Sequence, residues 1–347
     1  MEVAGSDCFV CAGLMGKHLT MTRMTERKIG RWQFATFSVG VSMPPGVQER
    51  EDELRSELKL TGRETAKAQA ARLISVEVAR DLRKRIERGR PDLSVVVDFA
   101  AFNIEVSSRP LFYYARYAKS PGVSQRRELC PHCSGAGCEK CRLTGFEQKP
   151  SVEDALRKKL AKICGTDRMK FTWIGSEDRD SAVMAPGRPF VVELKSPKRL
   201  KVPRRFAMRV RGSTIVVSNG RRLPSKPTRL PTFRFKTRIL GSVRSKVDPD
   251  RLADLRKVFR QATVGFDRPH DRPTSKVVHS VRARQKGRTL IIDADLDGGL
   301  PVKRLVSGEL VSPSVSEVLK TEVRCRSFDI CGVKETGKFG FAKVSWL

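Results

Sequence analysis

An acidic cluster interrupts this basic chain in the segment GSEDRDSAVMAPGRPFVVEL, which runs from Gly175 to Leu194. Its three carboxylates are Glu177, Asp178 and Asp180, and a Gly-Arg-Pro-Phe turn and an apolar, strand-like run follow them. A carboxylate held beside a buried strand can act as a nucleophile or as a general base. A solvated acidic turn, in which an Asp caps the loop, is the alternative interpretation.

The segment CPHCSGAGCEKC supplies a second kind of chemistry, because its cysteines have the spacing C-x2-C-x4-C-x2-C. Each CxxC pair can place two thiolates on one metal ion, and two pairs complete a tetrahedral zinc site. A third pair near the start of the chain leaves open which pairs share a zinc. A closed four-thiolate site has no free coordination position, so we predict a structural zinc. The predicted ligands are Cys130, Cys133, Cys138, Cys141, Cys8 and Cys11.

Composition points to a polyanionic partner. The 347 residues include 69 Lys and Arg against 38 Asp and Glu, a formal net charge of +31. Such an excess of positive charge destabilises the folded protein by self-repulsion unless a bound polyanion neutralises part of it, and nucleic acid is the first candidate. The sequence has no apolar run of about 18 residues and no pattern of a signal peptide, so we expect a cytoplasmic protein without membrane contact.

The pattern along the chain predicts the α+β class. Residues 50–89 are helix-prone, and a capping box of Ser151 and Asp154 starts a basic amphipathic helix. Further helices are predicted at about 249–260 and from Ser314. Residues 195–246 hold 17 Lys and Arg and no acid, which indicates strands and loops that contact phosphates. Strands are predicted at 32–43, within 92–117, and at 168–174, 189–195, 206–218, 233–241, 276–284 and 288–296.

Five segments in a fixed order resemble one family: CFVCAGLMG, RPLFYYARYAKSPGVSQRRELCPHCSGAGCEKCRLTG, SVEDAL, GSEDRDSAVMAPGRPFVVEL and LVSGELVSPSVSEVL. The chain resembles the archaeal and eukaryotic THUMP-containing tRNA pseudouridine synthases that act on T-loop uridines 54 and 55. The resemblance implies a zinc-binding, THUMP-like α/β domain for RNA binding over residues 1–150. It implies a catalytic domain with a mixed, largely antiparallel sheet over residues 151–347.

The same resemblance places the catalytic aspartate at Asp178 and implies tRNA as the partner, base flipping, and no catalytic cofactor. It assigns substrate binding to Phe235, Lys303, Pro301 and Arg188. Three positions depart from the family pattern: Phe235 and Pro301 stand where tyrosines are expected, and Ser176 stands where an arginine is expected. The alternative function is a non-catalytic, zinc-containing tRNA- or rRNA-binding protein. A weaker alternative, a DnaJ-type zinc chaperone, is disfavoured by the single copy of the motif and by the net charge.

Overall fold

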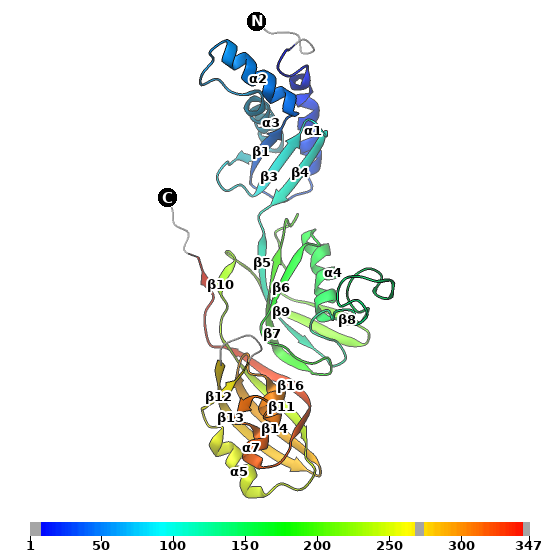
Figure 1. The fold of residues 1–347 in the computed structure, drawn as a ribbon, viewed down its shortest axis with the longest axis vertical. Coiled ribbons are helices and arrows are strands. Elements are labelled where there is room, and N and C mark those ends of the chain that lie inside the picture. Colours follow the sequence, from blue (N-terminus) through cyan, green and yellow to red (C-terminus); the bar gives the residue numbers. More distant parts are fainter. Residues whose placement is uncertain (1–7, 268–273, 343–347) are drawn as a thin grey trace. The chain divides into compact units, whose positions relative to one another are not determined.

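A computed structural model describes residues 8–267 and 274–342 of the chain (Figure 1). The chain divides into two compact units, and both are assembled from separate stretches of sequence. The first unit comprises residues 1–111, 163–168 and 194–201, and the second comprises residues 112–162, 169–193 and 202–347. The boundary at residue 150 between an RNA-binding domain and a catalytic domain stays a prediction.

The first unit is a small α/β fold whose sheet has the order β2-β1-β3-β4. Strand β1 pairs in parallel with β2 and β3, and β3 forms an antiparallel hairpin with β4. Helices α1 and α3 pack on this sheet, and Met21, Ile74 and Val95 are among the residues that form the buried core. The elements are η1 (Leu14–Lys17), α1 (His18–Ile29), β1 (Thr36–Ser42), α2 (Pro45–Glu57), α3 (Ala66–Leu82), β2 (Arg85–Ile86), β3 (Leu93–Asp98) and β4 (Asn103–Ser108).

The helix-prone stretch of the first unit forms two helices rather than one. Lys59 and Gly62 both have positive φ angles, so the helical path stops after α2. The side chain of Thr65 then accepts a hydrogen bond from the Ala68 N–H at 3.1 Å and caps the start of α3. The helical composition of this segment predicted the helices, while the two backbone reversals that separate them have no clear signal in it.

The second unit contains an 11-stranded sheet in which neighbouring strands are mostly antiparallel. Its order is β15-β12-β13-β14-β11-β16-β7-β5-β9-β8, and β6 pairs with β7. The strands are β5 (Leu111–Lys119), β6 (Met169–Trp173), β7 (Val183–Leu194), β8 (Phe206–Val210), β9 (Ser213–Leu223), β11 (Phe233–Ser242), β12 (Ala262–Phe266), β13 (Thr274–Lys286), β14 (Thr289–Asp297), β15 (Val311–Ser312) and β16 (Arg324–Glu335). A separate pair joins β10 (Pro227–Arg229) to β17 (Gly340–Phe341).

Short helices complete the second unit. They are η2 (Glu139–Cys141), α4 (Val152–Cys164), α5 (Pro249–Val258), α6 (Val302–Ser307) and α7 (Val315–Leu319). The predicted cap of α4 is confirmed, because the Ser151 hydroxyl donates to Asp154 at 2.7 Å and accepts from the Asp154 N–H at 3.0 Å. Ser314 and Glu317 form the capping box of α7.

The α+β class is confirmed, but one expected strand differs. The predicted strand 206–218 is a hairpin of β8 and β9 that turns at Arg211 and Gly212, both of which have positive φ angles. Within the described residues, no helix is long and apolar enough to cross a membrane.

Candidate active site

One cavity of about 410 Å³ in the second unit brings together the residues that the sequence assigned to catalysis and substrate binding. These residues come from four segments of the chain. Asp178 lies on the loop between β6 and β7, and Arg188 lies on β7. Phe235 lies on β11, while Pro301 and Lys303 lie at the start of α6. The volume falls in the range of small-molecule sites.

Asp178 and Lys303 form an ion pair at the mouth of this cavity. The Lys303 Nζ atom lies 2.9 Å from Asp178 Oδ2, and the two side chains are 57% and 40% exposed, respectively. Both groups are therefore accessible to a ligand and already adjacent to each other. Lys303 comes from α6, whose first turn begins at Pro301, so this short helix fixes the cation opposite the acidic loop.

Glu177 points away from solvent and forms a buried ion pair. Its Oε2 atom lies 3.1 Å from Arg188 Nη1, and the two side chains are 0% and 4% exposed. The geometry is not that of a hydrogen bond, and Glu177 Oε2 and Arg188 Nε have no hydrogen-bond partner. Arg188 also donates to the Ser176 carbonyl at 2.7 Å and, more weakly, to the Ile174 carbonyl at 3.4 Å. Arg188 therefore anchors the acidic loop from its buried side.

Two glycines of the motif allow this arrangement. Both Gly175 and Gly187 have positive φ angles. A Cβ atom on Gly175 would lie 2.0 Å from Arg188 Nη2, and one on Gly187 would lie 2.4 Å from the Tyr117 carbonyl oxygen. Only glycine leaves room for the arginine and for strand β5 at these two positions.

Strand β5 and the residues after it support the acidic loop. The Tyr117 hydroxyl donates to Glu177 Oε1 at 2.5 Å and accepts from Gln125 Nε2 at 2.8 Å. Burial, together with the Glu177 carboxylate, raises the pKa of Tyr117 well above its usual value, so the phenol keeps the proton that it donates. Gln125 also donates to the Gly175 carbonyl at 3.3 Å.

Lys119 provides a further support, which sequence reasoning missed. Its buried ammonium group donates to the carbonyls of Asp178, Arg179 and Ser181 at 3.2, 3.1 and 2.7 Å. Burial lowers the pKa of Lys119. The Lys119 and Tyr117 positions belong to the segment that contributes to the family resemblance, but nothing in their spacing indicates contact with a loop some 60 residues later.

Phe235 forms one wall of the cavity and is 4% exposed. The Arg188 guanidinium lies over its ring, with Cζ 4.8 Å from the ring centroid. This contact fixes the ring and links it to the acidic loop. Asp297 also lines the cavity, and it is paired with His279 at 2.9 Å. No sequence pattern singles out Asp297, because it ends an ordinary alternating strand.

The buried Glu177–Arg188 pair leads to a prediction about stability. Replacing Glu177 with Gln removes the counter-charge of an arginine that stays buried, which typically costs about 3–5 kcal/mol. We expect urea unfolding to show a loss of about 3 kcal/mol in the free energy of unfolding. The matched control is Asp180→Asn, which alters an exposed acid of the same loop and should change that value by less than about 0.5 kcal/mol. Equal stability of the two variants would contradict a structural role for Glu177.

The second predicted site is a cluster of four cysteines, also in the second unit. The Sγ atoms of Cys130, Cys133, Cys138 and Cys141 all lie within 4.8 Å of one another. The Sγ–Sγ distances of the pairs Cys130–Cys138, Cys133–Cys141 and Cys138–Cys141 are 3.9, 3.8 and 3.7 Å. A tetrahedral zinc ion with bonds of about 2.3 Å holds its sulfurs about 3.8 Å apart. The cluster therefore has the dimensions of a four-thiolate zinc site.

Backbone amides support the same conclusion. The N–H groups of Cys138 and Gly145 donate to Cys141 Sγ at 3.1 and 3.3 Å, and that of Gly137 donates to Cys133 Sγ at 3.2 Å. The Cys138 N–H is the main cause that lowers the pKa of Cys141 to about 6. Donors of this kind favour the thiolate form that binds a metal.

The other predicted pair of ligands lies in the first unit. Cys8 and Cys11 are not part of the four-cysteine cluster, and within residues 8–267 and 274–342 they do not belong to any other group of three or more metal-ligand side chains. Their role as zinc ligands stays a prediction.

Comparison with known proteins identifies the class of protein. Residues 22–98 match the family model of the Pus10 THUMP domain, archaeal, and residues 112–219 match that of Pus10, C-terminal. The tRNA pseudouridine synthase Pus10 of Cenarchaeum symbiosum (strain A) is 31% identical over 329 residues, which cover 93% of this chain and 80% of the relative. The corresponding enzyme of Nitrosopumilus maritimus (strain SCM1) is 27% identical over 328 residues, covering 94% and 85%.

The chain therefore belongs to the Pus10 family of tRNA pseudouridine synthases, and its first unit contains the THUMP domain. Among solved structures, a crystal structure of a Cbf5-Nop10-Gar1 complex matches with a TM-score of 0.34 and 11% identity. That match covers 62% of this chain and 47% of the other.

Proposed function

We propose that this chain isomerises uridine to pseudouridine in the T-loop of tRNA, at position 55, position 54 or both, with Asp178 as the catalytic carboxylate. One observation supports this most directly: the four segments that supply Asp178, Arg188, Phe235 and Lys303 converge on a single cavity. Family membership supports the reaction class, because the relatives are named tRNA pseudouridine synthases.

The reaction needs a carboxylate and a shaped cavity. The N1–C1′ bond breaks, the uracil rotates, the C5–C1′ bond forms, and the proton on C5 is lost while N1 gains one. Atoms and electrons balance within the substrate, so the rearrangement requires no oxidant, reductant or second substrate. Asp178 would act as a nucleophile toward the ribose or the base, or as the base that removes a proton. The uracil must leave its stack to reach Asp178, so base flipping is part of the proposal.

The cavity suggests a role for each neighbour of Asp178. Phe235 offers an aromatic face for the flipped uracil but no hydroxyl for a hydrogen bond. Lys303 stabilises negative charge on Asp178 or on the shifting base. Pro301 closes the cavity where the family resemblance expects a tyrosine. Arg188 acts on the substrate through Phe235 and Glu177, because its own guanidinium is buried.

The cysteine cluster has a structural role in this proposal. Cys130, Cys133, Cys138 and Cys141 would hold one zinc ion, and the zinc would stabilise the segment between β5 and α4. None of these cysteines lines the cavity that contains Asp178. The cytoplasmic location expected from the sequence fits a tRNA substrate and remains part of the proposal.

Incubation with three tRNA transcripts tests the function. The first carries both T-loop uridines, the second has cytidine at position 54, and the third has cytidine at position 55. Pseudouridine mapping should show a modified T-loop in the first transcript and should assign the position from the other two. Tight binding of all three transcripts without modification of any uridine would favour the non-catalytic RNA-binding alternative.

A further inference from the structure

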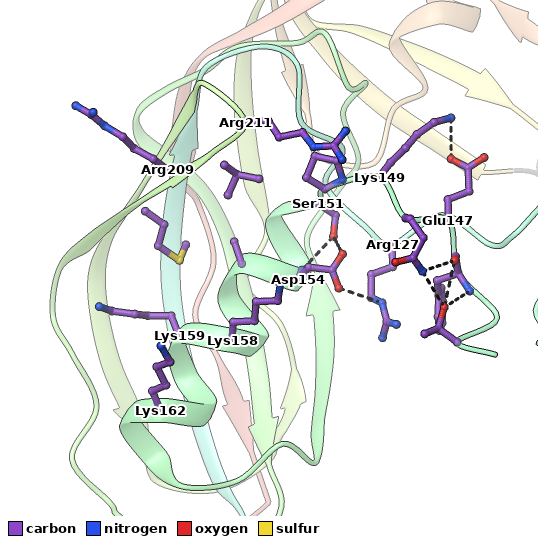
Figure 2. A pocket seen from close by; sticks show the side chains of 17 residues that line it. Arg127, Glu147, Lys149, Ser151, Asp154, Lys158, Lys159, Lys162, Arg209 and Arg211 are labelled. Atoms are coloured by element: carbon purple, nitrogen blue, oxygen red, sulfur yellow. Dashed lines mark hydrogen bonds and ion pairs between the residues drawn. The ribbon is translucent and has the colours of Figure 1, made fainter. Parts of the chain in front are cut away.

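A second cavity of the second unit lies between helix α4 and strand β8, and we call it the α4–β8 groove (Figure 2). Its volume is about 700 Å³, and it shares no lining residue with the cavity that contains Asp178. Seven lysines and arginines line it, against two acids. Figure 2 shows three of these lysines along α4, with two arginines contributed by the β8 segment. The groove therefore carries a surplus of five positive charges.

Both acids of the groove are already paired. Glu147 forms an ion pair with Lys149 at 2.7 Å, and Asp154 forms one with Arg127 at 3.2 Å. Asp154 additionally caps α4 through Ser151 at 2.7 Å. The remaining groove cations include Lys158, Lys159, Arg209 and Arg211. These four side chains are exposed and form no salt bridge with any acid in the part of the chain that the structure describes.

Helix α4 has a basic face that lines the groove, and it carries an ion pair outside the groove lining. Positions 151, 154, 155, 158, 159 and 162 all line the groove, and their spacing places them along one helical face. On this face Lys158 and Lys162 lie four residues apart, a like-charge arrangement that destabilises a helix by some tenths of a kcal/mol. Outside the groove lining, Arg157 pairs with Glu153 at 2.9 Å. The same helix therefore neutralises one pair of charges and leaves its groove face basic.

The hairpin of β8 and β9 adds two arginines, and one of them, Arg211, has an unfavourable backbone conformation. Val210 pairs with Ser213, so the turn consists of Arg211 and Gly212, with φ angles of 44° and 82°. Asn or Gly is preferred at the first position of such a turn, because a longer side chain disfavours a positive φ angle. Charges on β8 also protect an edge strand from pairing. That protection accounts for Arg209, but it does not account for the lysines of α4.

We propose that the α4–β8 groove binds consecutive phosphate groups of the RNA backbone, as an anchor separate from the cavity where the base reacts. This inference rests on the proposed function, since it takes the RNA to be the tRNA substrate. Long, flexible cations from two elements suit an extended polyanion and carry no base specificity. The sequence predicts phosphate contacts somewhere along residues 195–246, and the proposal narrows this prediction to one site. Arg209 and Arg211 are the residues of that stretch that line the groove.

The test compares two quadruple variants with the same change in net charge. The groove variant carries Lys158→Gln, Lys159→Gln, Arg209→Gln and Arg211→Gln. The control variant carries Arg256→Gln, Arg260→Gln, Lys286→Gln and Arg288→Gln, which alter exposed cations of the same unit away from the groove. The measurement is the dissociation constant for a tRNA transcript as a function of salt concentration.

Each lost phosphate contact lowers the slope of log affinity against log salt by about 0.7–0.9. If each of the four cations contacts a phosphate, the slope of the groove variant should fall by about 3, and its affinity for tRNA should fall at least tenfold at about 0.15 M salt. The control variant should lose less than 1 from the slope and less than threefold in affinity. Since all eight side chains are exposed, both variants should keep the wild-type unfolding temperature, and Lys158→Gln with Lys159→Gln serves as a milder second variant.

Equal losses in the groove and control variants would overturn the proposal, because they would show a general effect of net charge. An unchanged slope in the groove variant would overturn it as well. The binding test does not depend on the reaction. If the wild-type protein modifies no uridine while the salt slope of the groove variant falls, the proposed function is wrong and the proposal of a phosphate-binding groove is supported. If the wild-type protein modifies uridine and the salt slope of the groove variant is unchanged, the proposed function is supported and the proposal of a phosphate-binding groove is wrong.

Discussion

Replacing Asp178 with Asn is expected to lower pseudouridine formation below detection while tRNA affinity changes by less than about threefold, or roughly 0.7 kcal/mol. The amide has nearly the shape of the carboxylate, but it is neither a nucleophile nor a base. Substrate positioning depends mainly on phosphate contacts and base stacking, which the substitution leaves in place. Single-turnover pseudouridine assays and filter binding on the same transcript separate the two effects.

The control for this variant is Asp180→Asn, because Asp180 is an exposed carboxylate two residues away. It should reduce the rate much less than Asp178→Asn does. The partner of Asp178 is not left buried by the substitution, since the Lys303 side chain is 57% exposed, so little stability should be lost. Normal activity of Asp178→Asn, or a complete loss in Asp180→Asn alone, would show that the catalytic residue is assigned wrongly.

Replacing Cys130 and Cys133 with Ser is expected to remove the zinc and to destabilise the unit that contains the cluster. Structural zinc sites contribute folding free energy directly, about 10–16 kcal/mol in zinc-finger peptides. We expect a loss of at least about 4 kcal/mol here, which lowers the Tm of a unit of this size by about 10 °C. Elemental analysis should find at least one zinc per wild-type chain, and calorimetry measures the Tm.

Cys331→Ser is the matched control, since Cys331 is a half-buried cysteine outside the cluster. It should leave the zinc content unchanged and the Tm within a few degrees. Wild-type protein that contains no zinc, or a double variant that unfolds at the wild-type temperature, would contradict a structural metal at this position.

The sequence predicted most elements that position the candidate site, because their signals are local. The alternation of residues 233–241 marked β11, and the capping residue Ser151 marked the start of α4. The family resemblance points to Asp178, Phe235 and Lys303, and all three line one cavity of the structure. The close spacing of the four cysteines likewise predicts a cluster, and the sulfur–sulfur distances in the structure match those of a zinc site.

The parts that the sequence did not predict depend on contacts between distant residues. Tyr117 reaches Glu177 across 60 positions, and no periodicity within either segment indicates this pairing. Arg211 gave no turn signal, because its left-handed backbone is unusual for arginine, so β8 and β9 were expected as one strand. Glu177 and Asp180 look alike in sequence, yet one is buried against Arg188 and the other is exposed, since burial depends on the strands that pack behind the loop.

The supports of the acidic loop have a consequence for how this sequence tolerates evolutionary change. Lys119 and Arg188 hold the loop mainly through carbonyl oxygens of residues 174–181, and every amino acid carries such an oxygen. The course of the loop therefore depends little on the side chains of Ser176 and Asp180, whereas Gly175 and Glu177 are constrained by their own contacts with Arg188 and Tyr117. Ser176 can occupy the place where the family resemblance expects an arginine, and drift at such positions leaves the location of Asp178 unchanged, whereas Lys119 and Arg188 themselves have little freedom to vary.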